Sequence, residues 1–225
     1  MAGALVFDVN ETLLDLRALD PAFERAFGDP GARAEWFARL LHGSLVATVT
    51  GVYEDFGSIA ARALDAVTAR RRRTLPAEAR DEILGSVARL PPHPEVPGAL
   101  SRLRSAGFPM AALTNSAERT ARAQLEHAGL IDLFDEVLSV EAVGRYKPAP
   151  EPYLMASERL GRSPEGVRLV TAHDWDVWGA VRAGCRAAFV ARADLPFVIG
   201  EPPDVVGPDL DAVAEAILRV DEPSR

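Results

Sequence analysis

Short apolar runs alternate with segments of helical spacing along most of this 225-residue chain. The runs lie at residues 4–7, 110–113, 136–139, 167–170 and 187–190, with a weaker one at 204–206. Segments of helical spacing at 117–128, 152–160 and 177–183 separate the later runs, and each is followed by a glycine. This alternation predicts an α/β fold, a Rossmann-like parallel sheet with helices on both faces.

The interval from residue 14 to residue 90 breaks that rhythm, because it contains no convincing strand. Its spacing predicts amphipathic helices instead, at 21–27, 32–42, 51–68 and 76–90. A proline-rich stretch at 90–97 then predicts a stiff connector back into the alternating pattern. We therefore expect a Rossmann-like core made of residues 1–13 and 91–225, with residues 14–90 inserted as a separate helical domain.

The composition excludes several classes of partner and site. A formal net charge of −8 argues against nucleic acid and anionic membranes as main partners. The one cysteine, Cys185, allows no intrachain disulfide, which fits a reducing compartment. No apolar stretch approaches the ~20 residues that span a bilayer. We therefore expect a soluble, cytoplasmic protein with no contact with membranes.

Polar side chains follow the ends of several predicted strands. Asp8 ends the first run, Thr114 follows the second, and a stretch ending in Asp176 follows the fourth. Lys147 lies in a loop before a predicted helix. Ligands of open parallel sheets bind beyond the carboxyl ends of the strands, so these side chains should meet at one crevice.

Each of these residues also has a purely structural explanation, as a turn cap, a helix N-cap or a solvated lysine. Asp8 is the exception, because a carboxylate at the end of a buried strand is desolvated and needs a positive partner. Lys147 is the natural candidate. We therefore predict an ion pair between Asp8 and Lys147, with Thr114 and Asp176 on the same wall of the crevice.

Taken together, these residues resemble the motifs of the haloacid dehalogenase superfamily over nearly the whole chain. The resemblance rests on Asp8-x-x-x-Thr12, Leu113-Thr114-Asn115, Lys147-Pro148 and Trp175-Asp176, in the order and spacing of the superfamily. It implies that Asp8 is a nucleophile. It also implies that the helical insertion is the superfamily's cap domain.

Two positions distinguish the branches of this superfamily. Phosphatases carry an acid two residues after the nucleophile and another four residues before the position of Asp176, where this chain has Asn10 and Ala172. Magnesium prefers carboxylate and phosphate oxygens, so their loss leaves a poor metal site, although Asp174 lies two residues away from the expected position. The chain resembles the 2-haloacid dehalogenase branch, which implies no metal and no cofactor.

The resemblance to that branch also implies a substrate site. Arg39 matches a cap arginine that meets the substrate or the departing halide, and Phe56 matches an apolar pocket residue. The substrate carboxylate is expected at Thr114, Asn115 and the following helix N-terminus. The remaining expected contacts are Tyr153, Trp175 and Asn10, the last at a position where the branch's best-studied form has an aromatic residue.

The implied reaction has two steps. Asp8, held by Lys147 and Thr12, displaces the halide and forms an ester. Water positioned by Asp176, with Thr171 or His173, then hydrolyses that ester. His173 replaces an asparagine of the best-studied form, and it either positions this water or is a capped loop histidine.

Three other functions stay open at this point. The chain could be a magnesium-dependent phosphatase of the same fold, or a non-catalytic member that binds a small anion or a protein partner. It could also hydrolyse another carbon electrophile through the same ester. The leading expectation is hydrolysis of a small anionic 2-haloacid, in a branch where homodimers are common.

Overall fold

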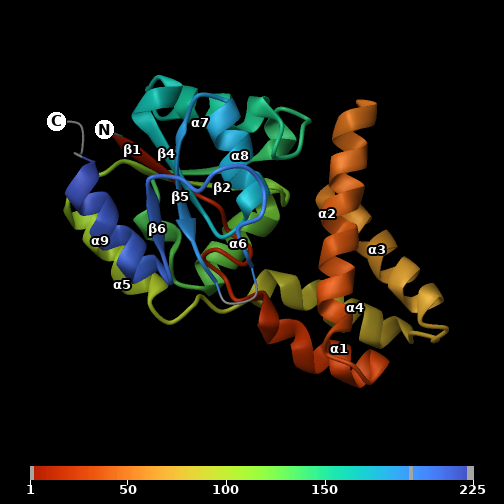
Figure 1. Cartoon of the computed structure of the whole chain (residues 1–225). Helices are drawn as coiled ribbons and strands as arrows, with labels where there is room; N and C mark the ends of the chain where they lie inside the picture. Colours follow the sequence, from red (N-terminus) through yellow and green to blue (C-terminus); the bar gives the residue numbers. More distant parts are fainter. Residues whose placement is uncertain (1–2, 193–194, 222–225) are drawn as a thin grey trace.

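The computed structural model describes residues 3–192 and 195–221, and its core is a six-stranded parallel sheet (Figure 1). The strands are ordered β3-β2-β1-β4-β5-β6, and each neighbouring pair is parallel. Their bounds are β1 Ala4–Phe7, β2 Met110–Thr114, β3 Glu136–Ser139, β4 Val167–Thr171, β5 Arg186–Val190 and β6 Val205–Gly207. The predicted α/β fold with a parallel sheet is confirmed, including the weak sixth strand.

Helices cover both faces of this sheet because successive side chains of a buried strand point to opposite sides. Leu5 and Phe7 pack in the same cluster as residues of α5 (Val96–Ser105), α6 (Glu118–His127) and α9 (Leu210–Val220). Val6 packs instead in a second cluster, with α7 (Pro150–Arg159) and α8 (Asp174–Arg182). In Figure 1, α5 and α9 lie on one side of the strands, and α7 and α8 lie on the other.

Four helices lie beside this core, in the interval between β1 and α5 (Figure 1). They are α1 Asp20–Phe27, α2 Ala32–Thr50, α3 Phe56–Arg70 and α4 Ala77–Ser86, and we call them the insertion helices. The indole of Trp36 on α2 is buried and donates a hydrogen bond of 2.9 Å to the Ala60 carbonyl on α3. Short 3-10 helices occupy Leu16–Leu19, Val87–Arg89, Ile131–Leu133, Val140–Ala142 and Pro164–Gly166.

Several predicted boundaries differ from the observed ones. Helix α2 continues to Thr50, and α3 begins only at Phe56, because Gly51 ends the first helix with φ 72° and Asp55 caps the second. The expected connector at 90–97 overlaps the start of α5, where Pro97 is tolerated because the first helical turn needs no backbone donor. Helix α8 begins at Asp174 rather than at 177, which places Asp176 in its first turn.

Among residues 3–192 and 195–221, no helix combines the length and the apolar character needed to cross a membrane.

The structure contains an ion cluster that the sequence did not predict, because its arginine lies within the apolar run at 167–170. Arg168 on β4 is fully buried, and its guanidinium contacts Asp221 at 2.5 Å and Asp204 at 2.6 Å. It also donates to the Ala187 carbonyl on β5. A buried cation is tolerated only when charges and acceptors surround it, as they do here. The cluster joins the beginning of β4 to the residue before β6 and to the residue after α9.

We expect Arg168→Met to lower the free energy of unfolding by about 3–5 kcal/mol, because the buried carboxylate of Asp221 loses the guanidinium that it contacts. The matched control is Arg102→Met. It removes an exposed ion pair of 2.8 Å with Asp211 and should cost less than about 1 kcal/mol. Urea denaturation of both variants measures the difference. Equal losses would contradict a structural role for the buried cluster.

Candidate active site

Asp8 lies directly after β1, the strand between β2 and β4 in the sheet. Its amide donates to the Val170 carbonyl at 3.0 Å, which continues the pairing with β4 by one residue. The Thr12 hydroxyl donates to Oδ2 of Asp8 at 2.6 Å and accepts from the Ala172 amide at 2.9 Å. Thr12 therefore holds the carboxylate in place and ties the loop after β1 to the loop after β4.

The ammonium group of Lys147 lies between two buried carboxylates. Its Nζ is 2.7 Å from Oδ1 of Asp8 and 2.8 Å from Oδ2 of Asp176, and the lysine side chain is 0% exposed. A third contact of 3.3 Å reaches the Leu113 carbonyl, so each of the three N–H donors has an acceptor. The backbone amide of Lys147 donates to Oδ1 of Asn115 at 3.0 Å, which fixes the lysine loop to the end of β2.

These contacts fix the charge of the nucleophile candidate. Burial acts to raise the pKa of Asp8, but the charge of Lys147, with smaller contributions from His173 and Thr12, brings it below its ordinary value. Burial likewise acts to lower the pKa of Lys147, and Asp176 and Asp8 raise it above its ordinary value. Asp8 is therefore an ionised carboxylate, and Lys147 an ammonium group, near neutral pH.

Tyr153 of α7 binds the second carboxylate oxygen of Asp176. The phenol of Tyr153 donates to Oδ1 of Asp176 at 2.6 Å, and burial followed by the charge of Asp176 raises the tyrosine pKa well above its ordinary value. Both oxygens of Asp176 are thus occupied, one by Lys147 and one by Tyr153. Gly179 permits this packing, because a Cβ there would lie 2.6 Å from the Tyr153 hydroxyl and from Cβ of Pro148.

The loop after β2 is held by its own polar side chains. Thr114 uses its hydroxyl to accept from the Ser116 amide at 3.1 Å, and the Ser139 hydroxyl donates to the Ser116 carbonyl at 2.8 Å. Asn10 donates to the Ser116 hydroxyl at 3.4 Å and accepts from Gln124 at 3.0 Å. Asn10 thus joins the loop after β1 to the loop after β2 and to α6, a role that the sequence did not indicate.

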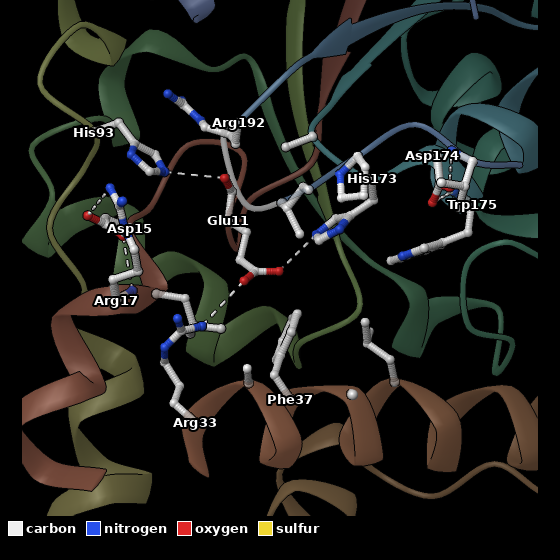
Figure 2. Close-up of a pocket in the computed structure, with 18 of the residues that line it drawn as sticks. Glu11, Asp15, Arg17, Arg33, Phe37, His93, His173, Asp174, Trp175 and Arg192 are labelled. Carbon is white, nitrogen blue, oxygen red and sulfur yellow. Dashed lines mark hydrogen bonds and ion pairs between the residues drawn. The ribbon is translucent and has the colours of Figure 1, made fainter. Parts of the chain in front are cut away.

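His173 is held by Thr171, whose hydroxyl accepts from the His173 amide at 3.1 Å. The imidazole stacks on the Trp175 ring at 5.0 Å between centroids. Its Nε2 is 3.6 Å from Oε2 of Glu11 and 3.8 Å from Oδ2 of Asp8. Figure 2 shows the imidazole pointing toward Glu11, with Phe37 of α2 below them.

Two adjoining cavities border this group of residues. The larger has a volume of about 540 Å³ and is lined by Glu11, His173 and Trp175, among others. The smaller, of about 140 Å³, is lined by Asn10, Phe56 and Ser116, among others. Phe37 of α2 lines both, so it separates them. The side chain of Asp8 is 7% exposed, and Asn10 and Glu11, two and three residues after it, line one cavity each.

The structure does not bring Arg39 to these cavities. Arg39 pairs with Glu35 at 3.3 Å, and it is the second residue after Phe37, which places it on roughly the opposite side of α2. One turn before Phe37, Arg33 does face the larger cavity, where it lies 3.6 Å from Oε1 of Glu11 and 2.5 Å from Asp20 (Figure 2). Helical periodicity relative to the apolar face of α2 is the signal that would have selected Arg33.

The residues around Asp8 do not fit a magnesium site. Ala172 brings no side-chain oxygen, Asn10 brings only a neutral amide, and the carboxylates of Asp8 and Asp176 are already paired with Lys147. Asp174 uses its oxygens to accept from the amides of Trp175, Val198 and Ile199 at 2.7, 3.0 and 3.1 Å. Within the described part of the chain, no cluster of three or more acidic, histidine or cysteine side chains could hold a metal ion.

The lowered pKa of Asp8 should appear as a pH dependence of stability. A carboxylate with a folded pKa below its unfolded value stabilises the fold above the unfolded pKa, and this contribution is lost as the pH falls through the folded pKa. From about pH 5 to about pH 3, wild-type protein should therefore lose more unfolding free energy than Asp8→Asn. Urea denaturation at stepped pH values measures both. Parallel curves would mean that Asp8 gains nothing from its buried ion pair.

Comparison with known proteins agrees with this geometry. The family model of haloacid dehalogenase-like hydrolases matches residues 2–184. The (S)-2-haloacid dehalogenase of Xanthobacter autotrophicus is 35% identical over 198 residues, covering 85% of this chain and 76% of that protein. Haloacetate dehalogenase H-2 of Moraxella sp. (strain B) is 29% identical over 217 residues, covering 95% of this chain and 97% of that protein.

Solved structures show the same likeness. The L-2-haloacid dehalogenase of Xanthobacter autotrophicus superposes with a TM-score of 0.88 at 28% identity, over 98% of this chain and 99% of that one. The same values hold for that enzyme with chloropropionic acid covalently bound. The family match covers most of the chain, and the parallel sheet and the residues at its strand ends fit it. The chain therefore belongs to the haloacid dehalogenase-like hydrolase family.

Proposed function

We propose that this protein hydrolyses small 2-haloalkanoic acids, of the (S) configuration, to 2-hydroxy acids through an ester on Asp8. The observation that carries the proposal is the state of the Asp8 carboxylate, which is buried, ionised and held by Lys147 and Thr12. A desolvated carboxylate in fixed geometry is a nucleophile suited to displacement at carbon. The neutral Asn10 fits a leaving group that needs no proton, as a halide does not.

The helical insertion, residues 14–90, is proposed to act as a cap over the site. Helix α2 brings Phe37 to the wall between the two cavities, and α3 brings Phe56 to the smaller one. Apolar side chains here would exclude bulk water during the displacement step. In place of Arg39, we assign the cation facing the substrate or the departing halide to Arg33.

The remaining predicted residues fall into two groups in this proposal. Thr114, Asn115 and Tyr153 act by position, because their polar atoms hold the loop after β2, the lysine loop and Asp176. Trp175 lines the larger cavity, and Phe56 and Ser116 line the smaller one. The substrate carboxylate would bind near Ser116, where the start of α6 favours an anion.

A magnesium-dependent phosphatase is the main alternative. Its leaving group needs an acid close to the nucleophile, and here that position holds Asn10, whose amide already bridges Ser116 and Gln124. Phosphoryl transfer also needs cations around the transferred group. Lys147 is the only cation within ion-pair distance of Asp8 among the described residues, apart from a protonated His173.

The test is halide release from (S)-2-chloropropionate beside a phosphate-ester screen, each with and without chelator. We expect halide release that chelator leaves unchanged and that Asp8→Asn reduces to background. In a single turnover in heavy-oxygen water with excess enzyme, the label should enter Asp8 while the hydroxy acid stays unlabelled, because water attacks the ester carbonyl.

Label appearing directly in the hydroxy acid would mean that water attacks the substrate carbon. Activity on phosphate esters that chelator abolishes would favour the phosphatase instead. The control variant is Arg102→Met, on the exposed side of α5, which should release halide like the wild type.

We also propose that the protein forms a homodimer through α2. The second half of this helix exposes apolar side chains, with Val49 85% exposed and Val46 46% exposed, and Val52 just beyond is 63% exposed. Such a row of exposed valines favours burial against another surface. Sedimentation velocity should give a dimer for the wild type and a monomer for Val49→Lys. A monomeric wild type would remove this part of the proposal.

A further inference from the structure

The second step of the proposed reaction, hydrolysis of the Asp8 ester, needs a group that handles protons at the cavity. Asp176 is unsuited, because Lys147 and Tyr153 occupy its two oxygens and its side chain is 0% exposed. Thr171 is fully buried, with its hydroxyl on the His173 amide. Of the three candidates predicted from sequence, His173 alone lines the larger cavity.

The surroundings of His173 favour a proton on Nε2. The polar atoms found near this nitrogen are acceptors, namely the Asn10 carbonyl at 3.3 Å, Oε2 of Glu11 at 3.6 Å and Oδ2 of Asp8 at 3.8 Å. A ring nitrogen facing acceptors serves as a donor, and the two carboxylates provide counter-charges for an imidazolium. The stacked Trp175 ring adds a face on which a cation is favourable.

Glu11 is held beside His173 in an unfavourable backbone conformation. Its φ is 63°, in the left-handed region that favours glycine, so the position carries strain. His93 contacts its carbonyl at 3.2 Å, and Arg33 contacts its carboxylate at 3.6 Å. Burial raises the pKa of Glu11, against the charges of His173 and Arg33, which makes the carboxylate a better proton acceptor. Strain of this kind collects at functional sites.

We propose that Glu11 and His173 form an acid–base pair that hydrolyses the ester on Asp8, with Glu11 as general base and His173 as general acid. This inference rests on the proposed function and goes beyond it, because displacement of a halide requires neither group. Both side chains line the larger cavity, and Nε2 of His173 lies 3.8 Å from Oδ2 of Asp8 and 3.6 Å from Oε2 of Glu11.

Every proton of the attacking water has an acceptor in the proposed step. Water adds its oxygen to Cγ of the Asp8 ester and gives one proton to the Glu11 carboxylate. The bond between Cγ and the ester oxygen breaks, its electron pair goes to that oxygen, and the imidazolium of His173 protonates it to give the hydroxy acid. Glu11 then returns its proton to His173, and the new carboxyl group of Asp8 releases one proton to solvent.

The experiment separates the two chemical steps with Glu11→Gln and His173→Asn. Rapid-mixing measurement of halide from (S)-2-chloropropionate should show one equivalent released per site at a rate near that of the wild type. Steady-state turnover should then fall about 100-fold or more, the range expected for loss of a general acid or base. Intact-mass and peptide analysis should find the acid bound covalently to Asp8 in both variants and not in the wild type.

A different pattern would overturn the inference. If either variant slows halide release and steady-state turnover by the same factor, with no trapped ester, the pair has no specific role in the second step. If the wild type itself releases no halide from 2-haloacids, the proposed function fails and this inference falls with it. The two failures are therefore distinguished by the wild-type burst.

Stability provides a readout that does not depend on the substrate. Glu11→Gly should keep or raise the urea midpoint, since glycine accepts φ 63°, while it traps the ester as Glu11→Gln does. Arg72→Gly is the matched control, because Arg72 also has a positive φ, 51°, but lies outside the site. It should raise the midpoint with unchanged turnover. A clear loss of stability in Glu11→Gly would show that Glu11 serves the fold, against this proposal.

Discussion

The ammonium group of Lys147, buried between Asp8 and Asp176, is the contact on which the rest of the site depends. Two carboxylates in a dry interior repel each other and would each lose far more solvation than they could recover alone. One lysine with three acceptors satisfies both and keeps Asp8 ionised. A cation supplied by the chain itself thus neutralises both carboxylates.

The fold delivers these groups from places far apart in the sequence. Asp8 and Asp176 follow the adjacent strands β1 and β4, and parallel strands bring such ends to the same edge. Lys147 comes from the loop before α7, and Asn115 fastens that loop to the end of β2. Gly179 lets α8 approach the Lys147-Pro148 loop closely enough for Tyr153 to reach Asp176. The packing of the core therefore determines the geometry of the site.

Much of this could be predicted from the sequence, and the limits have physical causes. Strand and helix periods revealed the parallel sheet, and desolvation of Asp8 predicted its pairing with Lys147. Arg39 was predicted from the resemblance to the dehalogenase branch, but Arg39 pairs with Glu35, and Arg33 on the same helix faces the larger cavity instead. The bridging role of Asn10, through Gln124 and Ser116, depends on contacts between distant segments, which no local pattern contains.

The larger cavity also explains how an acidic protein can admit an anion beside an ionised nucleophile. The whole chain carries −8, yet Arg17, Arg33 and Arg192 line this cavity against Glu11, Asp15 and Asp174. Three cations face three carboxylates there, so the arginine and carboxylate charges of this wall sum to zero although the whole chain is acidic. Arg33 is the cation of this wall that lies beside Glu11, 3.6 Å from its Oε1. An anion that enters the larger cavity therefore meets a wall without net negative charge, and Arg33 attracts it toward the residues beside Asp8.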